Sequence, residues 1–171
     1  QVYEYAKHAS AYGVKADNVN ADFEGVVKRS RGVADKMSKG VQFLMKKNKI
    51  DVIMGFGKLI AANKLEVTAA DGSKQVLEAK NIIIATGGRS RQLPSMPIDG
   101  KKIIGYREAM VLPQQPKSMI ICGSGAIGSE FAYFYNSLGT KVTIVEFMPK
   151  IVPVEDDEIS KELEKQFKSR A

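Results

Sequence analysis

Apolar side chains recur at helical spacing in the first third of the chain. Residues 1 to 12 alternate small and aromatic side chains up to Gly13, which predicts a short helix that stops there. A longer helical pattern starts at Asn20 or Asp22, either a suitable N-cap, and runs to about Lys47. One stripe of that helix is apolar: Val26, Val33, Met37, Val41 and Leu44. We expect this stripe to be buried and the basic opposite side to be solvated.

A run of strand-like segments follows. The segments are residues 50–56, 64–69, 74–79 and 81–85. Asp71-Gly72 predicts a hairpin, and residues 65–69 alternate in hydrophobicity as a half-buried antiparallel strand does. Residues 82–85 are continuously apolar, which predicts a central strand covered on both faces, ending in Thr86-Gly87-Gly88.

The pattern changes after the Pro-containing connector at residues 112–117, where we expect a domain boundary. An apolar strand ending at Cys122 precedes a helix that Gly139 ends, and a second strand covers residues 142–145. The predicted buried side of that helix consists of Ile127, Phe131, Phe134, Tyr135 and Leu138. A last helix starts at the acidic cluster of residues 155–158.

The loop between that apolar strand and its helix has the spacing of a dinucleotide-binding turn. Gly123 allows a tight turn, Gly125 lets the backbone approach a pyrophosphate, and Gly128 lets the helix pack closely on the strand. The helix N-terminus supplies N–H donors and a positive dipole. Glu146 ends the next strand, where an acidic residue accepts the ribose hydroxyls of NAD and repels a 2′-phosphate. Lys150, shortly after Glu146, is the one nearby basic residue that could bind the 2′-phosphate of NADP.

Composition narrows the class of protein further. The chain has 171 residues, 26% charged and 44% hydrophobic, and no apolar run approaches the roughly 20 residues of a membrane span. The net charge of +7 is scattered and does not form a basic patch, so we expect no nucleic-acid partner and no membrane. The single Cys122 excludes an intramolecular disulfide and indicates a reducing, cytoplasmic location, and we expect it to be a small buried packing residue. We predict no metal site.

The order of several motifs along the chain resembles the pyridine nucleotide-disulfide oxidoreductases, and most closely their dihydrolipoamide dehydrogenase branch. The matching motifs occur at residues 55–58, 84–89, 105–109, 123–130 and 143–156. The resemblance implies an α/β fold with parts of two Rossmann-like domains, the first with an antiparallel β-meander and long helices. Residues 1–115 would be the C-terminal part of an FAD-binding domain, and residues 116–171 the N-terminal part of an NAD-binding domain.

The resemblance also implies roles for particular residues. The backbone of Gly57, Thr86, Gly87 and Gly88 would lie beside FAD. The backbone of the NAD turn would hold the NAD pyrophosphate; its residues are Gly123, Ser124, Gly125, Ala126, Ile127, Gly128 and Ser129. Glu146 would accept the adenosine ribose hydroxyls. Glu130 would be the family's buried glutamate near the flavin, which tunes the hydride-transfer site.

Several features of the family are outside this sequence. The first glycine-rich FAD turn, the Cys-x4-Cys disulfide and the C-terminal His-x4-Glu pair do not occur in it. We therefore expect an internal fragment of a redox flavoenzyme that oxidises dihydrolipoamide with NAD. The parent would be a homodimer that acts on lipoyl domains of a 2-oxo acid dehydrogenase complex. The fragment itself would be redox-inactive and bind NAD weakly at best, since its second sheet ends after two strands.

Two alternatives remain open at this point. One is a non-enzymatic nucleotide-binding or self-associating chain, because a truncated sheet exposes edges and apolar faces. The other is a flavin-free NAD-dependent Rossmann dehydrogenase. The residues that would distinguish lipoamide from a related disulfide substrate are not in the sequence.

Overall fold

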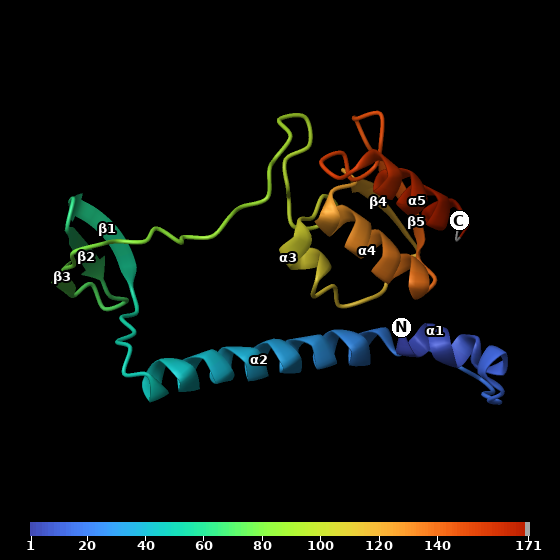
Figure 1. The fold of residues 1–171 in the computed structure, drawn as a ribbon, viewed down its shortest axis with the longest axis horizontal. Coiled ribbons are helices and arrows are strands. Elements are labelled where there is room, and N and C mark those ends of the chain that lie inside the picture. Colours follow the sequence, from blue (N-terminus) through green and yellow to red (C-terminus); the bar gives the residue numbers. More distant parts are fainter. Residues whose placement is uncertain (170–171) are drawn as a thin grey trace. The chain divides into compact units, whose positions relative to one another are not determined.

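The computed structural model describes residues 1–169, which form two compact units. One unit contains residues 1–30 together with residues from Gln92 onward, and the other contains Arg31–Arg91. Helices alternate with one antiparallel and one parallel sheet along the chain (Figure 1). The predicted α/β class is thereby confirmed.

The N-terminal helices begin and end as their sequence predicts. Helix α1 (Val2–Lys7) passes into a 3-10 turn, η1 (Ala9–Tyr12), which ends at Gly13 with a left-handed φ of 71°. Helix α2 (Phe23–Lys47) starts after Asp22, whose carboxylate accepts the Gly25 N–H at 3.0 Å. Asp22 is therefore the N-cap.

Helix α2 ends without a glycine. Lys49 adopts φ 55°, the Ile50 N–H donates to the Met45 carbonyl at 3.0 Å, and the Lys49 N–H donates to the Lys46 carbonyl at 3.2 Å. These bonds form a Schellman motif that satisfies carbonyls of the last turn.

The apolar stripe of α2 is not buried, contrary to the prediction. Val33, Met37, Val41 and Leu44 are exposed, and Phe23 is the buried residue of the helix. Within residues 31–91 no strand packs extensively along the helix, so the stripe has nothing to lie against. The hydrophobic periodicity predicted the helix correctly, but the predicted burial of its apolar stripe is wrong.

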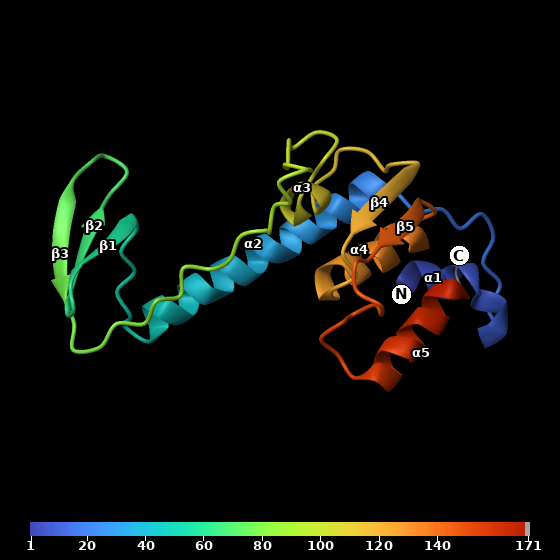
Figure 2. The ribbon, with the colours of Figure 1, turned by 90° about the horizontal axis from the view of Figure 1, so that it is seen from above.

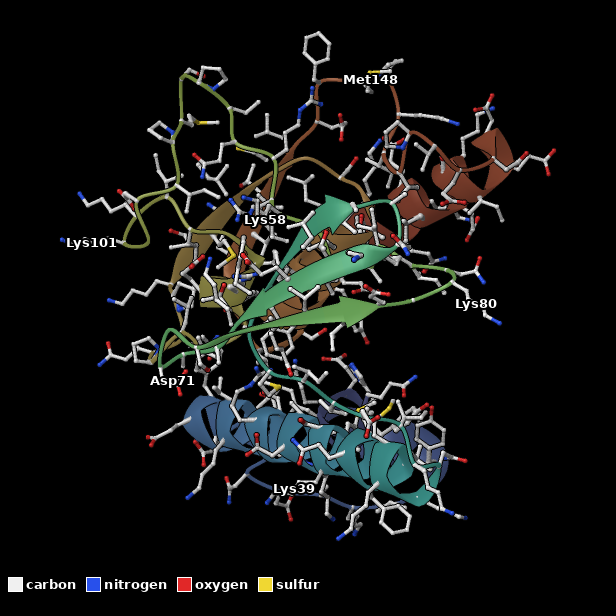
Figure 3. All side chains as sticks on the ribbon, turned by 90° about the vertical axis from the view of Figure 1, so that its left-hand side faces the viewer. Lys39, Lys58, Asp71, Lys80, Lys101 and Met148 are labelled. Atoms are coloured by element: carbon white, nitrogen blue, oxygen red, sulfur yellow. The ribbon has the colours of Figure 1, made fainter. Side chains whose placement is uncertain are left out.

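The unit of residues 31–91 carries a three-stranded antiparallel meander, β1 (Phe56–Ala61), β2 (Lys64–Thr68) and β3 (Lys74–Glu78). The predicted Asp71-Gly72 hairpin joins β2 to β3, and the Asp71 carboxylate accepts both the N–H and the hydroxyl of Ser73. Figure 3 shows Asp71 and Lys80 near opposite ends of β3. Val67 in the middle strand is buried, as its alternation predicts.

The first predicted strand, residues 50–56, is misplaced by several residues. Strand β1 begins only at Phe56, which pairs with Thr68, the last residue of β2. Residues 50–54 therefore have no strand opposite them and remain irregular and exposed. Gly55 comes directly before the first paired residue, and the strands approach closely there only because it is a glycine, since a Cβ would come within 2.5 Å of the Thr68 carbonyl oxygen.

The predicted central strand at residues 81–85 is also wrong for this structure. These residues form no strand, and Ile83 is 90% exposed. A continuously apolar strand needs a parallel neighbour and a layer on each face. The described residues provide neither a parallel neighbour nor covering layers for this segment, so its apolar side chains face solvent.

The other unit contains a parallel strand-helix-strand arrangement. Strands β4 (Ser118–Cys122) and β5 (Lys141–Val145) pair in parallel with Ile120 opposite Thr143, and α4 (Ala126–Ser137) connects them. The helices α3 (Tyr106–Ala109) and α5 (Asp157–Lys168) precede and follow this arrangement (Figure 2). The strand-turn-helix-strand order predicted from residues 118–146 is therefore present.

The core of this unit centres on Tyr135, which is 0% exposed. Its ring lies against Phe134, Phe131 and Phe23, at centroid distances of 5.0, 6.3 and 6.1 Å. Its hydroxyl donates to the Ala109 carbonyl at 2.6 Å, which ties α3 to α4. Ile127, predicted on the buried side, is 58% exposed, because it lies in the first turn of α4 at the open end of the sheet.

Two further findings concern the described chain as a whole. No helix within residues 1–169 is both long enough and apolar enough to cross a lipid bilayer. No cluster of three or more His, Cys, Asp or Glu side chains in the same residues could hold a metal ion.

Candidate nucleotide-binding site

The glycine turn between β4 and α4 has the local geometry that a dinucleotide turn requires. Gly123 adopts φ 97°, a conformation that favours glycine, and its N–H continues the ladder to the Val145 carbonyl at 2.8 Å. A Cβ on Gly128 would overlap the Gly123 carbonyl oxygen and lie 3.3 Å from the Ile121 side chain. Only glycine at position 128 lets α4 lie this close to β4.

The start of α4 leaves backbone donors available. Gly125 is the N-cap and no side chain caps the helix. The N–H groups of the first turn therefore have no intrahelical acceptor, and they carry the positive end of the helix dipole. Nothing lies within 4 Å of where a Cβ on Gly125 would be, so a ligand can approach the backbone there. These features fit a pyrophosphate.

Glu146 lies beside the turn, as the sequence predicts. One carboxylate oxygen, Oε2, accepts the Ser124 N–H at 2.7 Å and the Ser124 hydroxyl at 2.6 Å. The other, Oε1, accepts the Met148 N–H at 2.9 Å. The bond from Met148, followed by those from Ser124, lowers the pKa of Glu146 to about 2. The carboxylate is therefore ionised at neutral pH and acts only as an acceptor.

Two predicted site residues, Ser124 and Ser129, use their polar groups in hydrogen bonds within the site itself. Ser124 is 0% exposed, and its N–H and hydroxyl are both used by Glu146. The Ser129 hydroxyl donates to the Ser124 carbonyl at 2.9 Å and is buried. The donors open to a phosphate are therefore the N–H groups at the start of α4, in Ala126 and Ile127 and at Gly128.

Lys150, the basic residue that could bind the 2′-phosphate of NADP, is already paired with other groups of this chain. Its ammonium group lies 2.6 Å from the Asp157 carboxylate and 2.5 Å from the Glu155 carbonyl. The pairing connects the loop after β5 to the start of α5. A lysine held in this way is not free to bind a 2′-phosphate, which favours NAD. Met148 projects from the same loop in Figure 3.

Glu130 is exposed, whereas the resemblance implies a buried glutamate. It is the fifth residue of the helix, outside the first turn, so the helix dipole alone does not account for a carboxylate there. Its side chain is exposed and forms no ion pair with the described residues. Its role near a flavin stays a prediction.

The predicted FAD contacts lie in the unit of residues 31–91. Gly57 is in β1, and a Cβ there would make only ordinary contact with Leu65, so packing does not require a glycine at this position. Thr86, Gly87 and Gly88 lie in an exposed irregular segment, where Gly87 has φ 79°. The described residues form no cradle for a flavin around them, so no chemical step is assigned to that group.

Two further features of the unit that contains the glycine turn are an exposed cysteine and a surface hollow. Cys122 is exposed, which contradicts its predicted burial, because nothing in the described chain covers the end of β4 on that side. A hollow of about 400 Å³ lies between α1 and the end of α5, lined by residues that include Tyr5, His8 and Gln166. It contains none of the predicted site residues.

Sequence reasoning missed the side-chain role of Ser124 and the backbone partners of Glu146. The middle positions of a Gly-x-Gly-x-x-Gly turn tolerate many residues, so a serine there gives no signal of its own. The Met148 N–H reaches Glu146 through a local turn. The Val152 N–H reaches Ser124 only because the loop after β5 folds back, which the sequence pattern does not encode.

Comparison with known proteins identifies the family. Residues 3–170 match the model of the pyridine nucleotide-disulphide oxidoreductases. The dihydrolipoyl dehydrogenase of Chlorobaculum parvum is 48% identical over 98% of the chain and 36% of its own length. That of Zymomonas mobilis is 45% identical over 99% of the chain and 36% of its own length. The chain thus spans about 36% of the length of these relatives.

A solved structure shares the fold as well. The crystal structure of LpdA from Mycobacterium tuberculosis superimposes with a TM-score of 0.88 and 30% identity, over 99% of this chain and 38% of LpdA. The family match extends through both compact units and includes the glycine turn and Glu146. The chain therefore belongs to the pyridine nucleotide-disulphide oxidoreductase family.

Proposed function

We propose that this chain is the NAD-turn portion of a dihydrolipoyl dehydrogenase, together with part of the FAD-binding domain that precedes it. The observation that carries the proposal is the ionised Glu146 carboxylate, held by hydrogen bonds beside a glycine turn with free helix N–H groups. NAD would place its pyrophosphate at the start of α4 and its adenosine ribose at Glu146.

The wider assignment rests on the family and on the order of the motifs. Residues 1–115 would belong to the FAD-binding domain and residues 116–171 to the NAD-binding domain. The whole enzyme would be a homodimeric, cytoplasmic flavoprotein that uses FAD and NAD to oxidise dihydrolipoamide on the lipoyl domains of a 2-oxo acid dehydrogenase complex. In that enzyme FAD would pass electrons between a redox disulfide and NAD. The match over residues 3–170 weighs against a flavin-free dehydrogenase.

Amide NMR spectra of the ¹⁵N-labelled chain test the NAD site. Addition of NAD at millimolar concentrations should shift the amides of residues 123–130 and 146–148 and leave those of the meander, residues 56–78, in place. NADP should shift the same amides less, because Glu146 repels a 2′-phosphate and Lys150 is paired. Shifts confined to other residues, or an equal response to NADP, would refute the proposal.

A second property is favoured by a specific observation. The surface of the described chain carries large hydrophobic side chains that no element covers, among them Met37, Phe43, Ile83 and Ile84. Apolar surface of this extent favours self-association. We propose that the chain associates with itself in solution, and light scattering that gives a monodisperse monomer at high concentration would exclude this.

A further inference from the structure

Ser124 connects three segments of the candidate site from a fully buried position. Its N–H and hydroxyl both donate to Glu146 Oε2, at 2.7 and 2.6 Å. The Val152 N–H lies 3.2 Å from both the Ser124 carbonyl oxygen and its hydroxyl oxygen. The turn after β4, the end of β5 and the loop before α5 therefore meet at one side chain.

The donors around Ser124 determine where its single hydroxyl proton goes. The Val152 N–H can only donate, so the Ser124 hydroxyl oxygen serves it as an acceptor. The hydroxyl proton is then left for the one acceptor within reach, Glu146 Oε2. The Ser160 hydroxyl lies 3.4 Å from the Val152 carbonyl, longer than an ordinary O–H···O hydrogen bond, so the position of Val152 does not depend on it. The serine hydroxyl is thus oriented by its surroundings before any ligand binds.

This arrangement determines which part of the carboxylate faces a ligand. Oε2 receives two donors from Ser124, whereas Oε1 forms one hydrogen bond, with the Met148 N–H, and the Phe147 N–H interacts more weakly with the carboxylate. A carboxylate oxygen accepts about two hydrogen bonds. Oε1 therefore keeps an unused acceptor position, and the Ser124 bonds prevent the carboxylate from rotating away from the turn.

We propose that Ser124 is a positioning residue that holds the Glu146 carboxylate so that Oε1 is presented to the adenosine ribose of NAD. The inference rests on the proposed function, because it assigns the ligand of Glu146. No charged side chain of the described residues contributes to the lowered pKa of Glu146, and Lys150 is paired with Asp157. Hydrogen bonds therefore keep this carboxylate ionised, against the desolvation that acts to raise its pKa.

Two alanine variants separate positioning from general support of the turn. Ser124→Ala removes the hydroxyl bonded to Glu146, and Ser160→Ala removes an equally buried hydroxyl near Val152 that does not touch Glu146. The probes are NAD titrations at pH 7 and acid titrations of the Glu146 carboxyl carbon, both followed by NMR of the 171-residue chain. Should Ser124→Ala lose its folded spectrum, Ser124→Cys keeps a similar volume with a weaker donor and is measured instead.

We expect Ser124→Ala to weaken NAD binding about tenfold and to raise the titration midpoint of Glu146 by about one pH unit. Ser160→Ala should leave both unchanged. Equal NAD affinity and an unchanged midpoint in Ser124→Ala would overturn the inference while the proposed function stands, as would equal losses in the two variants. If the wild-type chain gives no NAD-dependent shift at residues 123–130, the proposed function itself fails.

Discussion

At the residue scale, the Glu146 carboxylate is held in place by hydrogen bonds and not by a salt bridge. Three donors from the turn and the following loop converge on its two oxygens. Such bonds favour the charged form of a carboxylate. The same bonds that prepare the site for a ribose also join the end of β5 to the turn after β4, so binding and local stability depend on one group.

Acid should weaken this junction in a defined pH range. The pKa of Glu146 is about 2 in the folded chain and ordinarily 4.5, so its stabilising contribution is complete above pH 4.5 and is lost as the pH falls toward 2. Urea unfolding of wild type and Glu146→Gln at several pH values measures this. The difference in free energy of unfolding between them should be constant above about pH 5 and shrink below pH 4.5.

Comparison with Glu146→Gln removes the effect of other acidic groups. Hydrogen bonds also lower the pKa of Asp99, mainly from the Lys101 N–H, and of Asp71, mainly from Ser73. Both groups are unchanged in the variant, so their contributions cancel. A difference that stays constant down to pH 2.5 would show that Glu146 is not held as described.

At the scale of elements, the closeness of α4 to β4 depends on Gly128. Gly128→Ala would place a methyl group against the Gly123 carbonyl oxygen, which is rigid backbone. We expect a loss of about 1–3 kcal/mol in the free energy of unfolding, as for overpacking elsewhere. Thermal and urea unfolding measure it.

Gly40→Ala in α2 is the matched control. Gly40 is also a helical glycine, but nothing lies within 4 Å of the position where its Cβ would be. Helix propensity then predicts a gain of up to about 1 kcal/mol. A loss of similar size in both variants would argue against close packing at Gly128.

The contact between α3 and α4 depends on the hydroxyl of Tyr135. Tyr135→Phe leaves the Ala109 carbonyl without its 2.6 Å donor in a buried position, which should cost about 1–2 kcal/mol. Tyr12→Phe removes the hydroxyl of an exposed tyrosine and should change stability by less than about 0.5 kcal/mol. Denaturant unfolding of the two variants distinguishes them, and equal stability of Tyr135→Phe and wild type would contradict the role of this bond.

The elements that the sequence predicts correctly are those stabilised within their own neighbourhood. The Asp22 cap, the Asp71-Gly72 hairpin and the strand-turn-helix around Gly123–Gly128 all depend on residues close in sequence. Residues 81–85 fail as a strand because a central strand depends on distant partners, which the described residues do not provide. Ser124 illustrates the same limit at the site, since its role depends on a loop that returns from residue 152.

At the scale of the whole molecule, the sequence has the glycine turn but no pair of cysteines that could accept electrons from a dithiol. It contains one cysteine, and its one histidine, His8, lies in the loop after α1. A dithiol substrate needs a disulfide that accepts its electrons. We therefore expect the purified chain to reduce no NAD when supplied with dihydrolipoamide, with or without added FAD.

A spectrophotometric assay at 340 nm checks this expectation, with a full-length dihydrolipoyl dehydrogenase as the positive control. Turnover by the chain that persists after alkylation of Cys122 would show that it holds redox groups other than those described. Turnover that alkylation abolishes would instead assign a redox role to Cys122, against the expectation that a lone thiol is inert here.

We propose that Glu146 and the glycine turn form an NAD site of low affinity. The most direct test is the dissociation constant of NAD for wild type and Glu146→Gln, measured by amide NMR at pH 7. We predict a wild-type value of about 1 mM, corresponding to roughly −4 kcal/mol, and a value at least about tenfold higher for the variant, with shifts at residues 123–130. Equal affinity of the two proteins, or micromolar affinity of the wild-type chain, would contradict the account.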